Sequence, residues 1–470
     1  MLKPDNLIKV AILPLLIIGS AFAQAVPNSR QNPQNAQAYF EQGLKLRQQG
    51  KLTEAVEAYK AGLRLNPTSA YYYGELSYTY SLLKQNDEAV QAAKKAVEID
   101  PKYVYGYTRL GHQYTTMQMY EEAAKVFRQA LLLSPNDDAS HASLGYAATK
   151  LKQYDEAIKS LEKSVELKSE NGHAHMQLGF AYLEAGKDQE AIRASRQAIV
   201  YKVKNAAIAY NNIGYAYQRL GQYEESAVAL RQAVQLDPLY MKAYSNLGYT
   251  LVLLGRLEES IEVLKQAISL KPDEFWPRMH LGGVYYSLHR YQQASDQLKE
   301  ATRIDPKFVN AFIGLGQSYV QIGKYEEATE AFTQVIYLKP QEANAFFYRG
   351  FAYLNLGNGT SAAADARKYL ELSGGRNKRD LYMYLVAHFG YRQAGVDTEA
   401  TRVLEEATTK IETKSWPYPL TLYLRRQITA QDLLAQATDG DKKTEAQAYL
   451  GTDLLFPASV RRQRLISNGS

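Results

Sequence analysis

The stretch AYNNIGYAYQRLGQYEESAVALRQAVQLDP, residues 209–238, holds two apolar patterns of helical period, separated by a glycine and closed by a proline. Apolar and small residues recur at spacings of three and four in both halves, which predicts two amphipathic helices. Gly221 lies where the first helix must end, because glycine tolerates the left-handed backbone that a helix end usually needs. Pro238 cannot continue the second helix. The stretch therefore predicts a helical hairpin.

The same pattern recurs along most of the chain. Neither predicted helix can bury its apolar face alone, so neighbouring copies must cover one another. The spacing of the copies is 34 residues, and one inserted residue before Pro238 makes one interval 35. Small residues mark the close-contact position of the first helix: Gly43, Ser77, Gly111, Gly145, Gly179, Gly214, Gly248, Gly282, Gly316 and Gly350.

This period and these marker residues resemble the tetratricopeptide repeat (TPR) family. The resemblance covers residues 36–376 in ten units. It implies an all-α fold, a right-handed α-solenoid of antiparallel helix pairs stacked into a TPR superhelix. First helices would line the concave side of the superhelix, and second helices would form its outer side. Ser169 and Val203 replace two of the unit-ending prolines, so a change of superhelical pitch is expected around residues 169–206.

The N-terminus has the pattern of a cleavable secretory signal peptide over residues 1–25. Lys3 and Lys9 precede or flank a short apolar run at residues 10–18, and small residues follow at a possible cleavage site. The run is shorter than the roughly 20 residues of an ordinary membrane span, although an uncleaved anchor is the alternative. The chain has no cysteine, so lipidation at an N-terminal cysteine is excluded. We expect a periplasmic or secreted protein, with a flexible leader at residues 26–35.

The repeat pattern weakens after Gly375. Residues 377–455 are expected to form a degenerate TPR pair and a C-terminal helical cap, and residues 456–470 a disordered basic tail. Thr429 and Asp441 are predicted to cap short helices in this region. The order of Trp416–Pro417, short helices and an Ala-Tyr-Leu-Gly helix loosely resembles exported NlpI-like TPR proteins.

The sequence contains no recognisable catalytic constellation. It lacks cysteine nucleophiles, a glycine-rich phosphate loop and metalloprotease or hydrolase motifs. His173 and His175 are two residues apart, which places them on different faces of a helix and argues against a shared metal. We therefore predict that the protein is not an enzyme and binds no metal or cofactor. The net charge of +6 is spread over mixed-sign helices, so no nucleic-acid interface is indicated.

Tyrosine is unusually abundant, with 38 copies. Tyrosines at two repeated positions, such as Tyr39 and Tyr285, are predicted to pack between helices. The position after each glycine marker, and a few others, would face the concave groove according to the resemblance. The predicted groove residues are Tyr71, Tyr78, Tyr105, His112, Tyr146, His173, Phe180, Asn211, Asn212, Tyr215, Asn246, Tyr249, Trp276, Tyr286 and Phe351.

Aromatic rings with polar tips suit the binding of an extended peptide. The asparagines would add amide groups that hydrogen-bond a peptide backbone. The alternative is that the tyrosines only pack against each other and close the groove. The functional hypothesis is a non-catalytic scaffold or adaptor that binds a partner protein or peptide in the groove, without a stable membrane span. A glycan- or peptidoglycan-binding envelope protein is the second hypothesis. The identity of the partner and the oligomeric state stay open.

Overall fold

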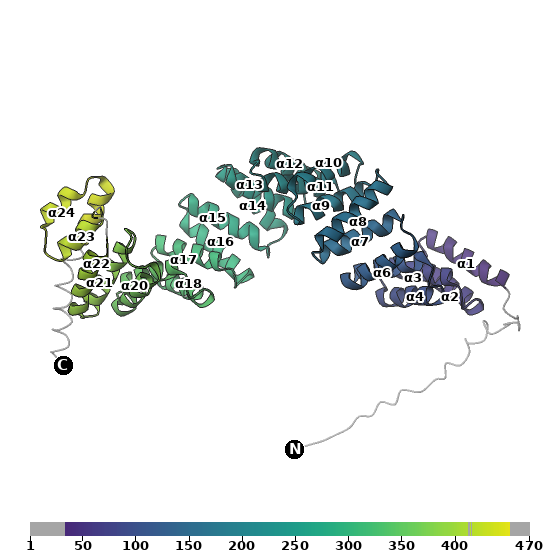
Figure 1. Cartoon of the computed structure of the whole chain (residues 1–470), viewed down its shortest axis with the longest axis horizontal. Coiled ribbons are helices and arrows are strands. Elements are labelled where there is room, and N and C mark those ends of the chain that lie inside the picture. The colour runs from purple at the N-terminus through teal and green to yellow at the C-terminus, as the bar shows by residue number, and fades with distance from the viewer. Residues whose placement is uncertain (1–32, 412–413, 415, 452–470) are drawn as a thin grey trace, which may run out of the picture. The chain divides into compact units, whose positions relative to one another are not determined.

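The computed structural model describes residues 33–411, 414 and 416–451. These residues form helices joined by short turns, and no strand occurs among them. Figure 1 shows the order of the helices along the chain. The predicted all-α solenoid of antiparallel helix pairs is confirmed. The predicted signal peptide, residues 26–32 of the predicted leader and the predicted tail lie outside the described residues.

The chain divides into two compact units, with the boundary between Glu190 and Ala191. This boundary lies inside α10 (Asp188–Val200) and within the irregular region noted in the sequence. The helices of the first unit are α1 (Pro33–Gln48), α2 (Leu52–Leu65), α3 (Ala70–Leu82), α4 (Asn86–Ile99), α5 (Val104–Thr116), α6 (Tyr120–Leu133), α7 (Asp138–Lys150), α8 (Tyr154–Leu167) and α9 (Gly172–Glu184).

The second unit continues the repeat and ends in shorter helices. Residues 440–451, the last of the described chain, are also helical. The named helices of this unit are α11 (Ala206–Arg219), α12 (Tyr223–Leu236), α13 (Met241–Leu253), α14 (Leu257–Leu270), α15 (Phe275–Ser287), α16 (Tyr291–Ile304), α17 (Val309–Gln321), α18 (Tyr325–Leu338), α19 (Ala343–Asn355), α20 (Gly359–Ser373), α21 (Asp380–Gln393), α22 (Asp397–Lys410), α23 (Tyr418–Leu424) and α24 (Ala430–Gln436).

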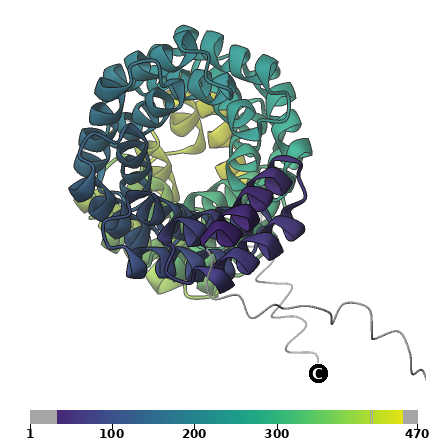
Figure 2. The ribbon, with the colours of Figure 1, turned by 90° about the vertical axis from the view of Figure 1, so that its right-hand side faces the viewer.

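Each first helix packs against the second helix that follows it, as α11 does against α12. First helices also contact the next first helix of the same unit, for example α3 with α5 and α13 with α15. Figure 2 shows successive helices side by side in this way within each unit. Because of this packing, side chains from several first helices share one surface.

The glycine markers allow the two helices of a pair to approach closely. A Cβ atom on Gly214 would lie 2.5 Å from Cγ of Leu230, and Leu230 is completely buried. The same offset of sixteen residues joins Gly43 to Tyr59 and Gly316 to Phe332. The large side chain of the second helix therefore occupies the space that the glycine leaves.

Ser77 is the one marker that is not glycine, and its partner is correspondingly small. The residue sixteen positions later is Ala93, which is fully buried. The Ser77 hydroxyl donates a hydrogen bond of 2.8 Å to the carbonyl of Ala89. The Ser77 hydroxyl thus lies in the space that a leucine or an aromatic ring of the second helix fills in other repeats. Its hydrogen-bond donor is satisfied by the Ala89 carbonyl.

Two adjacent glycines in α15 give a matched test of this packing. A Cβ atom on Gly282 would lie 2.6 Å from Cγ of Leu298, whereas a Cβ atom on Gly283 would meet nothing within 4 Å. We expect Gly282→Ala to lower the free energy of unfolding by about 1–3 kcal/mol through overpacking. Gly283→Ala should raise it by about 0.5–1 kcal/mol, because alanine is the better helix residue. Chemical denaturation followed by circular dichroism measures both, and equal effects would contradict the packing account.

The turn between the two helices of each pair contains one residue in the left-handed region. Gly221 has a φ of 75°, which confirms its predicted role. Four repeats place a larger residue there, for example Lys84 with a φ of 60°. The turn geometry is therefore kept even where the sequence lacks the glycine, at the conformational cost that a side chain adds.

At both tyrosine positions predicted to lie between helices, most of the side chains are half-buried. Tyr285 is buried, as predicted. Tyr39 in α1 is 42% exposed, so its assignment to the core is wrong. The described residues contain no earlier helix pair that could cover α1. The helix itself begins at Pro33, so residues 33–35 of the predicted flexible leader are helical.

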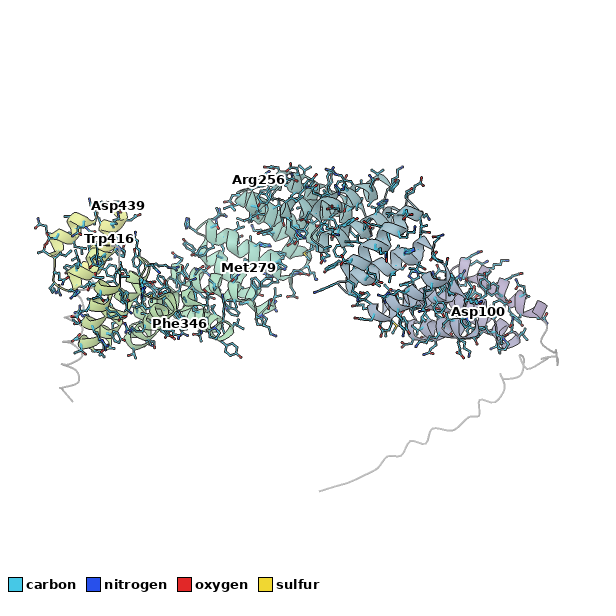
Figure 3. All side chains as sticks on the ribbon, in the orientation of Figure 1. Asp100, Arg256, Met279, Phe346, Trp416 and Asp439 are labelled. Carbon is cyan, nitrogen blue, oxygen red and sulfur yellow. The ribbon has the colours of Figure 1, made fainter. Side chains whose placement is uncertain are left out.

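Helices α21 and α22 occupy the range in which we expect a degenerate pair. The last helices share a core around Trp416 with α21 and α22, and the Trp416 ring nitrogen donates a hydrogen bond of 2.8 Å to Glu445. Thr429 caps α24 through a capping box, as predicted. The cap predicted at Asp441 is wrong: residue 440 is already helical, and Asp439 accepts the backbone N–H of Lys442 at 2.9 Å. Figure 3 labels Trp416 and Asp439 in this region.

None of the described helices combines the length and the apolar character needed to cross a membrane.

Candidate binding surface of the first helices

The predicted groove residues all come from first helices. They lie on α3, α5, α7 and α9 in the first unit, and on α11, α13, α15 and α19 in the second. Large exposed apolar or aromatic side chains on a shared face commonly mark an interaction surface. The predicted residues with exposed side chains are Tyr71, His173, Phe180, Tyr215, Tyr249 and Trp276. Those with half-buried side chains are Tyr78, Tyr105, His112, Tyr146, Asn246, Tyr286 and Phe351.

In the first unit, two arginines contact the ring of Tyr78. The guanidinium carbons of Arg47 and Arg109 lie 4.9 and 5.0 Å from the ring centroid. Arg109 also lies 4.8 Å from the ring centroid of Tyr105. Such contacts between a cation and an aromatic face are attractive and hold the long arginine side chain in place. The sequence prediction had included the tyrosines but neither arginine.

The two arginines differ in their anionic partners. Arg47 forms an ion pair with the buried carboxylate of Glu75. Burial lowers the pKa of Arg47, but the hydrogen bond and the charge of Glu75 outweigh burial, so the pKa is raised overall. Burial also raises the pKa of Tyr105 to about 12, although the charge of Arg109 opposes the rise. The Tyr105 hydroxyl is therefore neutral at physiological pH, and it has a side-chain hydrogen bond with Glu75.

His112 is held neutral in the same region. Burial, and then the charge of Arg109, lower its pKa to about 4. Its ring lies edge-on to Phe127, with 5.3 Å between the centroids. His112 therefore contributes an uncharged ring to this surface.

Further along the first unit, Lys150 repeats the contact of a cation with aromatic rings. Its Nζ atom lies 5.3 Å from the ring centroid of Tyr146 and 5.9 Å from that of Phe180. On α3, the exposed ring of Tyr71 packs on the ring of Phe40, with 4.9 Å between the centroids. On α9, Nε2 of His173 lies 3.0 Å from the side-chain nitrogen of Gln177. The surface of the first unit thus alternates aromatic rings with cations.

In the second unit, the three asparagines mostly serve packing. Asn211 and Asn212 are only 8% and 4% exposed. The side-chain oxygen of Asn211 accepts a hydrogen bond of 2.9 Å from the side-chain nitrogen of Asn246. The expectation that all three offer their amides to a peptide therefore needs correction: the helices packed on α11 enclose Asn211 and Asn212, and only Asn246 keeps part of its surface.

The aromatic residues of the second unit form a stack of rings. The rings of Tyr249 and His280 are stacked at 4.5 Å, and those of His280 and Trp276 at 5.6 Å. Burial lowers the pKa of His280 to about 4, so the middle ring is uncharged. Trp276 is 51% exposed. Tyr215 on α11 occupies the position of the repeat that Tyr249 has on α13.

The last two predicted residues lie further along the second unit. Tyr286 packs edge-on against Tyr291 at 5.3 Å, and burial raises its pKa. Phe351 lines a pocket of about 570 Å³ together with residues of α21 and of the helical residues 440–451. Phe351 is thus separated from the ring stack by α17.

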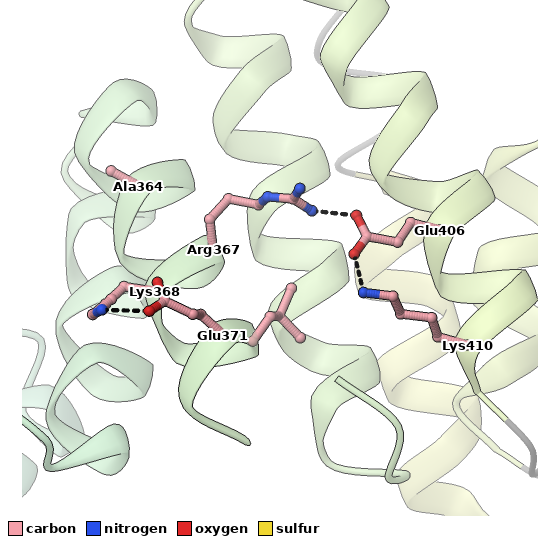
Figure 4. A pocket seen from close by; sticks show the side chains of 7 residues that line it. Ala364, Arg367, Lys368, Glu371, Glu406 and Lys410 are labelled. Carbon is pink, nitrogen blue, oxygen red and sulfur yellow. Dashed lines mark hydrogen bonds and ion pairs between the residues drawn. The ribbon is translucent and has the colours of Figure 1, made fainter. Parts of the chain in front are cut away.

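A second pocket, of about 500 Å³, lies between α20 and α22 (Figure 4). Its charged groups are paired with each other: Arg367 with Glu406, Glu406 with Lys410 at 2.7 Å, and Lys368 with Glu371 at 2.8 Å. Because these charges already have partners, this pocket offers less to a ligand than the first-helix surface does.

Four residues of this surface are not among the groove residues predicted from the sequence: Arg47, Arg109, Lys150 and His280. Arg109 and His280 occupy the same repeated position, two residues before the glycine marker. Following that position through all repeats would have found both. Arg47 contacts a ring from a neighbouring helix and has no comparable signal. Lys150 follows Tyr146 by four residues on the same helix, a spacing that places the two side chains on one face.

Comparisons with known proteins agree with the repeat pattern. Tetratricopeptide repeat models match residues 70–103, 104–137, 139–171 and 211–275, and a TPR repeat model matches residues 43–83, 282–323 and 316–357. The search of curated proteins found no match. The family matches end before the C-terminal helices, so the likeness of that region to NlpI-like proteins stays a prediction.

Several solved structures of repeat proteins are similar to parts of the chain. YrrB, described as a TPR protein with an unusual peptide-binding site, is 26% identical over 40% of this chain and 96% of its own, with a TM-score of 0.36. MamA is 24% identical over 37% and 96%, with a TM-score of 0.34. PilF of Pseudomonas aeruginosa is 18% identical over 43% and 92%, with a TM-score of 0.40.

Proposed function

Because the chain belongs to the tetratricopeptide repeat family, we propose that it is an exported scaffold that binds a partner protein on the aromatic face of its first helices. TPR proteins generally mediate protein–protein interactions, and the fold is a typical non-catalytic scaffold. The observation that carries the proposal is the set of exposed rings on this face, Tyr215, Tyr249 and Trp276 in the second unit.

The chemistry of the face suits an extended peptide. Tyrosine and tryptophan rings bury a large area on binding and lose little side-chain entropy. The stack of Tyr249, His280 and Trp276 is already ordered by its own contacts, so a ligand does not have to immobilise the rings. Asn246 adds a partly exposed amide beside them. An extended segment of a partner protein would pack its side chains on the rings and hydrogen-bond through its backbone.

Export is the second part of the proposal. It rests on the signal-peptide pattern of residues 1–25. The partner would then be another envelope or secreted protein. Fractionation of cells that express the full chain should find the protein outside the cytoplasm, with the N-terminal segment removed.

A pull-down tests the binding proposal. The full chain should recover a partner from the extracytoplasmic fraction, and a variant with Tyr215→Ala and Tyr249→Ala should lose it. Both rings are exposed, so the helices should stay intact, as circular dichroism would show. If the partner is still recovered with the fold intact, the aromatic face of the second unit is not the binding surface.

A glycan ligand is the alternative, because flat stacked rings such as Trp276 and His280 also suit the face of a sugar. This alternative expects retention of the purified protein on insoluble peptidoglycan or polysaccharide without any protein partner. Retention that is lost with Trp276→Ala would favour the glycan.

A further inference from the structure

We propose that the first unit contains a site for an acidic side chain of the partner, centred on the guanidinium of Arg109. The segment bound by this unit would then be an acidic peptide. This inference rests on the proposed function and adds the charge of the ligand, which the aromatic rings alone do not determine.

Arg109 is a cation that has no anionic partner among the described residues. Its contacts among the described residues are the rings of Tyr78 and Tyr105. Its Nε atom is buried and has no hydrogen-bond acceptor. An unpaired buried N–H is costly, and such groups in native proteins usually have a partner. A carboxylate offers acceptors that match the planar fork of the guanidinium.

The neighbouring carboxylates are already engaged. Glu75 pairs with Arg47. Asp137, whose charge reaches His112, accepts the backbone N–H of Ser140 at 2.9 Å and so caps α7. His112 beside Arg109 is neutral. Arg47, Glu75 and Arg109 together therefore carry one net positive charge, and that charge is on Arg109.

The rings around Arg109 make the site selective for a peptide rather than a free ion. Tyr78 and Tyr105 fix the guanidinium from their faces, which lowers the entropy lost on binding. The Tyr105 hydroxyl is neutral and already has a side-chain hydrogen bond with Glu75, so the peptide carboxylate would bind through the guanidinium. The rings also offer apolar area to residues that flank the acidic one.

A second cation extends the site along the first unit. Lys150 on α7 contacts Tyr146 and Phe180, and α7 is the first helix next to α5. Packed helix axes lie about 8–10 Å apart, and side chains on one face of an extended chain repeat about every 7 Å. A peptide that crosses α5 and α7 can therefore place one acidic side chain at Arg109 and another at Lys150.

The test uses the purified full chain and three fluorescent peptides of equal length, measured by anisotropy. The first peptide alternates glutamate with apolar residues and has an amidated C-terminus. The second replaces every glutamate with glutamine. The third is the glutamine peptide with a free C-terminal carboxylate. We expect the glutamate peptide to bind at least about tenfold more tightly than both others, with affinity that falls as salt rises.

Variants locate the effect. Arg109→Gln should abolish most of the preference for glutamate, whereas Arg109→Lys should keep part of it because the charge remains. Lys159→Gln, on the exposed side of α8, removes a positive charge away from this surface and should leave binding unchanged. The salt dependence of the unaltered protein gives a measure that does not depend on how a variant folds.

The acidic site is wrong if the glutamate and glutamine peptides bind equally, if folded Arg109→Gln keeps the full preference for glutamate, or if the peptide with the free C-terminal carboxylate binds more tightly than the glutamate peptide. It is also wrong if an added anionic polysaccharide displaces the labelled glutamate peptide better than the unlabelled glutamate peptide does. If no peptide binds while the variant with Tyr215→Ala and Tyr249→Ala still loses its partner, the acidic site is wrong and the proposed function stands.

Discussion

Asp365→Ala is expected to lower the free energy of unfolding by about 3–5 kcal/mol, because it leaves a buried arginine without its counter-charge. The two carboxylate oxygens of Asp365 accept hydrogen bonds of 2.7 and 2.8 Å from Nε and Nη2 of Arg349. Asp365 is buried in α20. Arg349 also donates to Thr333 at 2.9 Å, and its side chain is only 16% exposed, so little water reaches the guanidinium when the carboxylate is removed.

The double variant Asp365→Leu with Arg349→Met serves as the control. Replacing a whole buried ion pair by apolar residues is often neutral, so this variant should recover most of the lost stability. Chemical denaturation followed by circular dichroism measures both proteins under the same conditions. A loss of less than about 1 kcal/mol in Asp365→Ala, as for an exposed pair, would show that this pair does not hold α19 against α20.

Trp276→Ala is expected to weaken partner binding by about 2–4 kcal/mol, or roughly 30- to 1,000-fold in Kd. The indole is half exposed, yet it is ordered by contacts with His280 at 5.6 Å and Phe308 at 5.6 Å. An exposed and ordered tryptophan has the properties of a binding hot spot. Titration of the captured partner against the purified chain measures the change.

Two further substitutions make this prediction specific. Trp276→Phe keeps a ring in the stack and should lose less affinity than Trp276→Ala. Tyr337→Ala removes an aromatic side chain that is 79% exposed on the second helix α18, and it should leave binding unchanged. Equal losses from Trp276→Ala and Tyr337→Ala would mean that exposed aromatic area matters without regard to which helix carries it.

The fold could be predicted because the same packing between two helices recurs from repeat to repeat. Gly214 faces Leu230 and Gly43 faces Tyr59 at the same offset, so the period alone identifies the helix pair. Ser77 breaks the glycine pattern, but Ala93 compensates for it. Local signals were also sufficient at Thr429, whose capping box depends only on the residues that follow it.

The binding surface was harder to predict because its properties arise between helices. The sequence indicates that Asn211 and Asn212 share a face with aromatic residues, but their burial depends on how closely the neighbouring helices pack on α11. Arg109 acquires its role from a ring on α3 and a ring on its own helix. The cap at Asp439 was missed because Asp441, two residues later, carries the same local signal.

Site-specific crosslinking in cells tests the central claim most directly. A photoreactive amino acid is placed at Tyr249 on the first-helix surface, or at Tyr337 on the second helix α18, and the attached molecules are identified. We expect a specific crosslinked partner protein from position 249 and none from position 337. A partner that crosslinks from position 337 and not from position 249 would contradict the claim that this protein binds its partner on the first-helix surface.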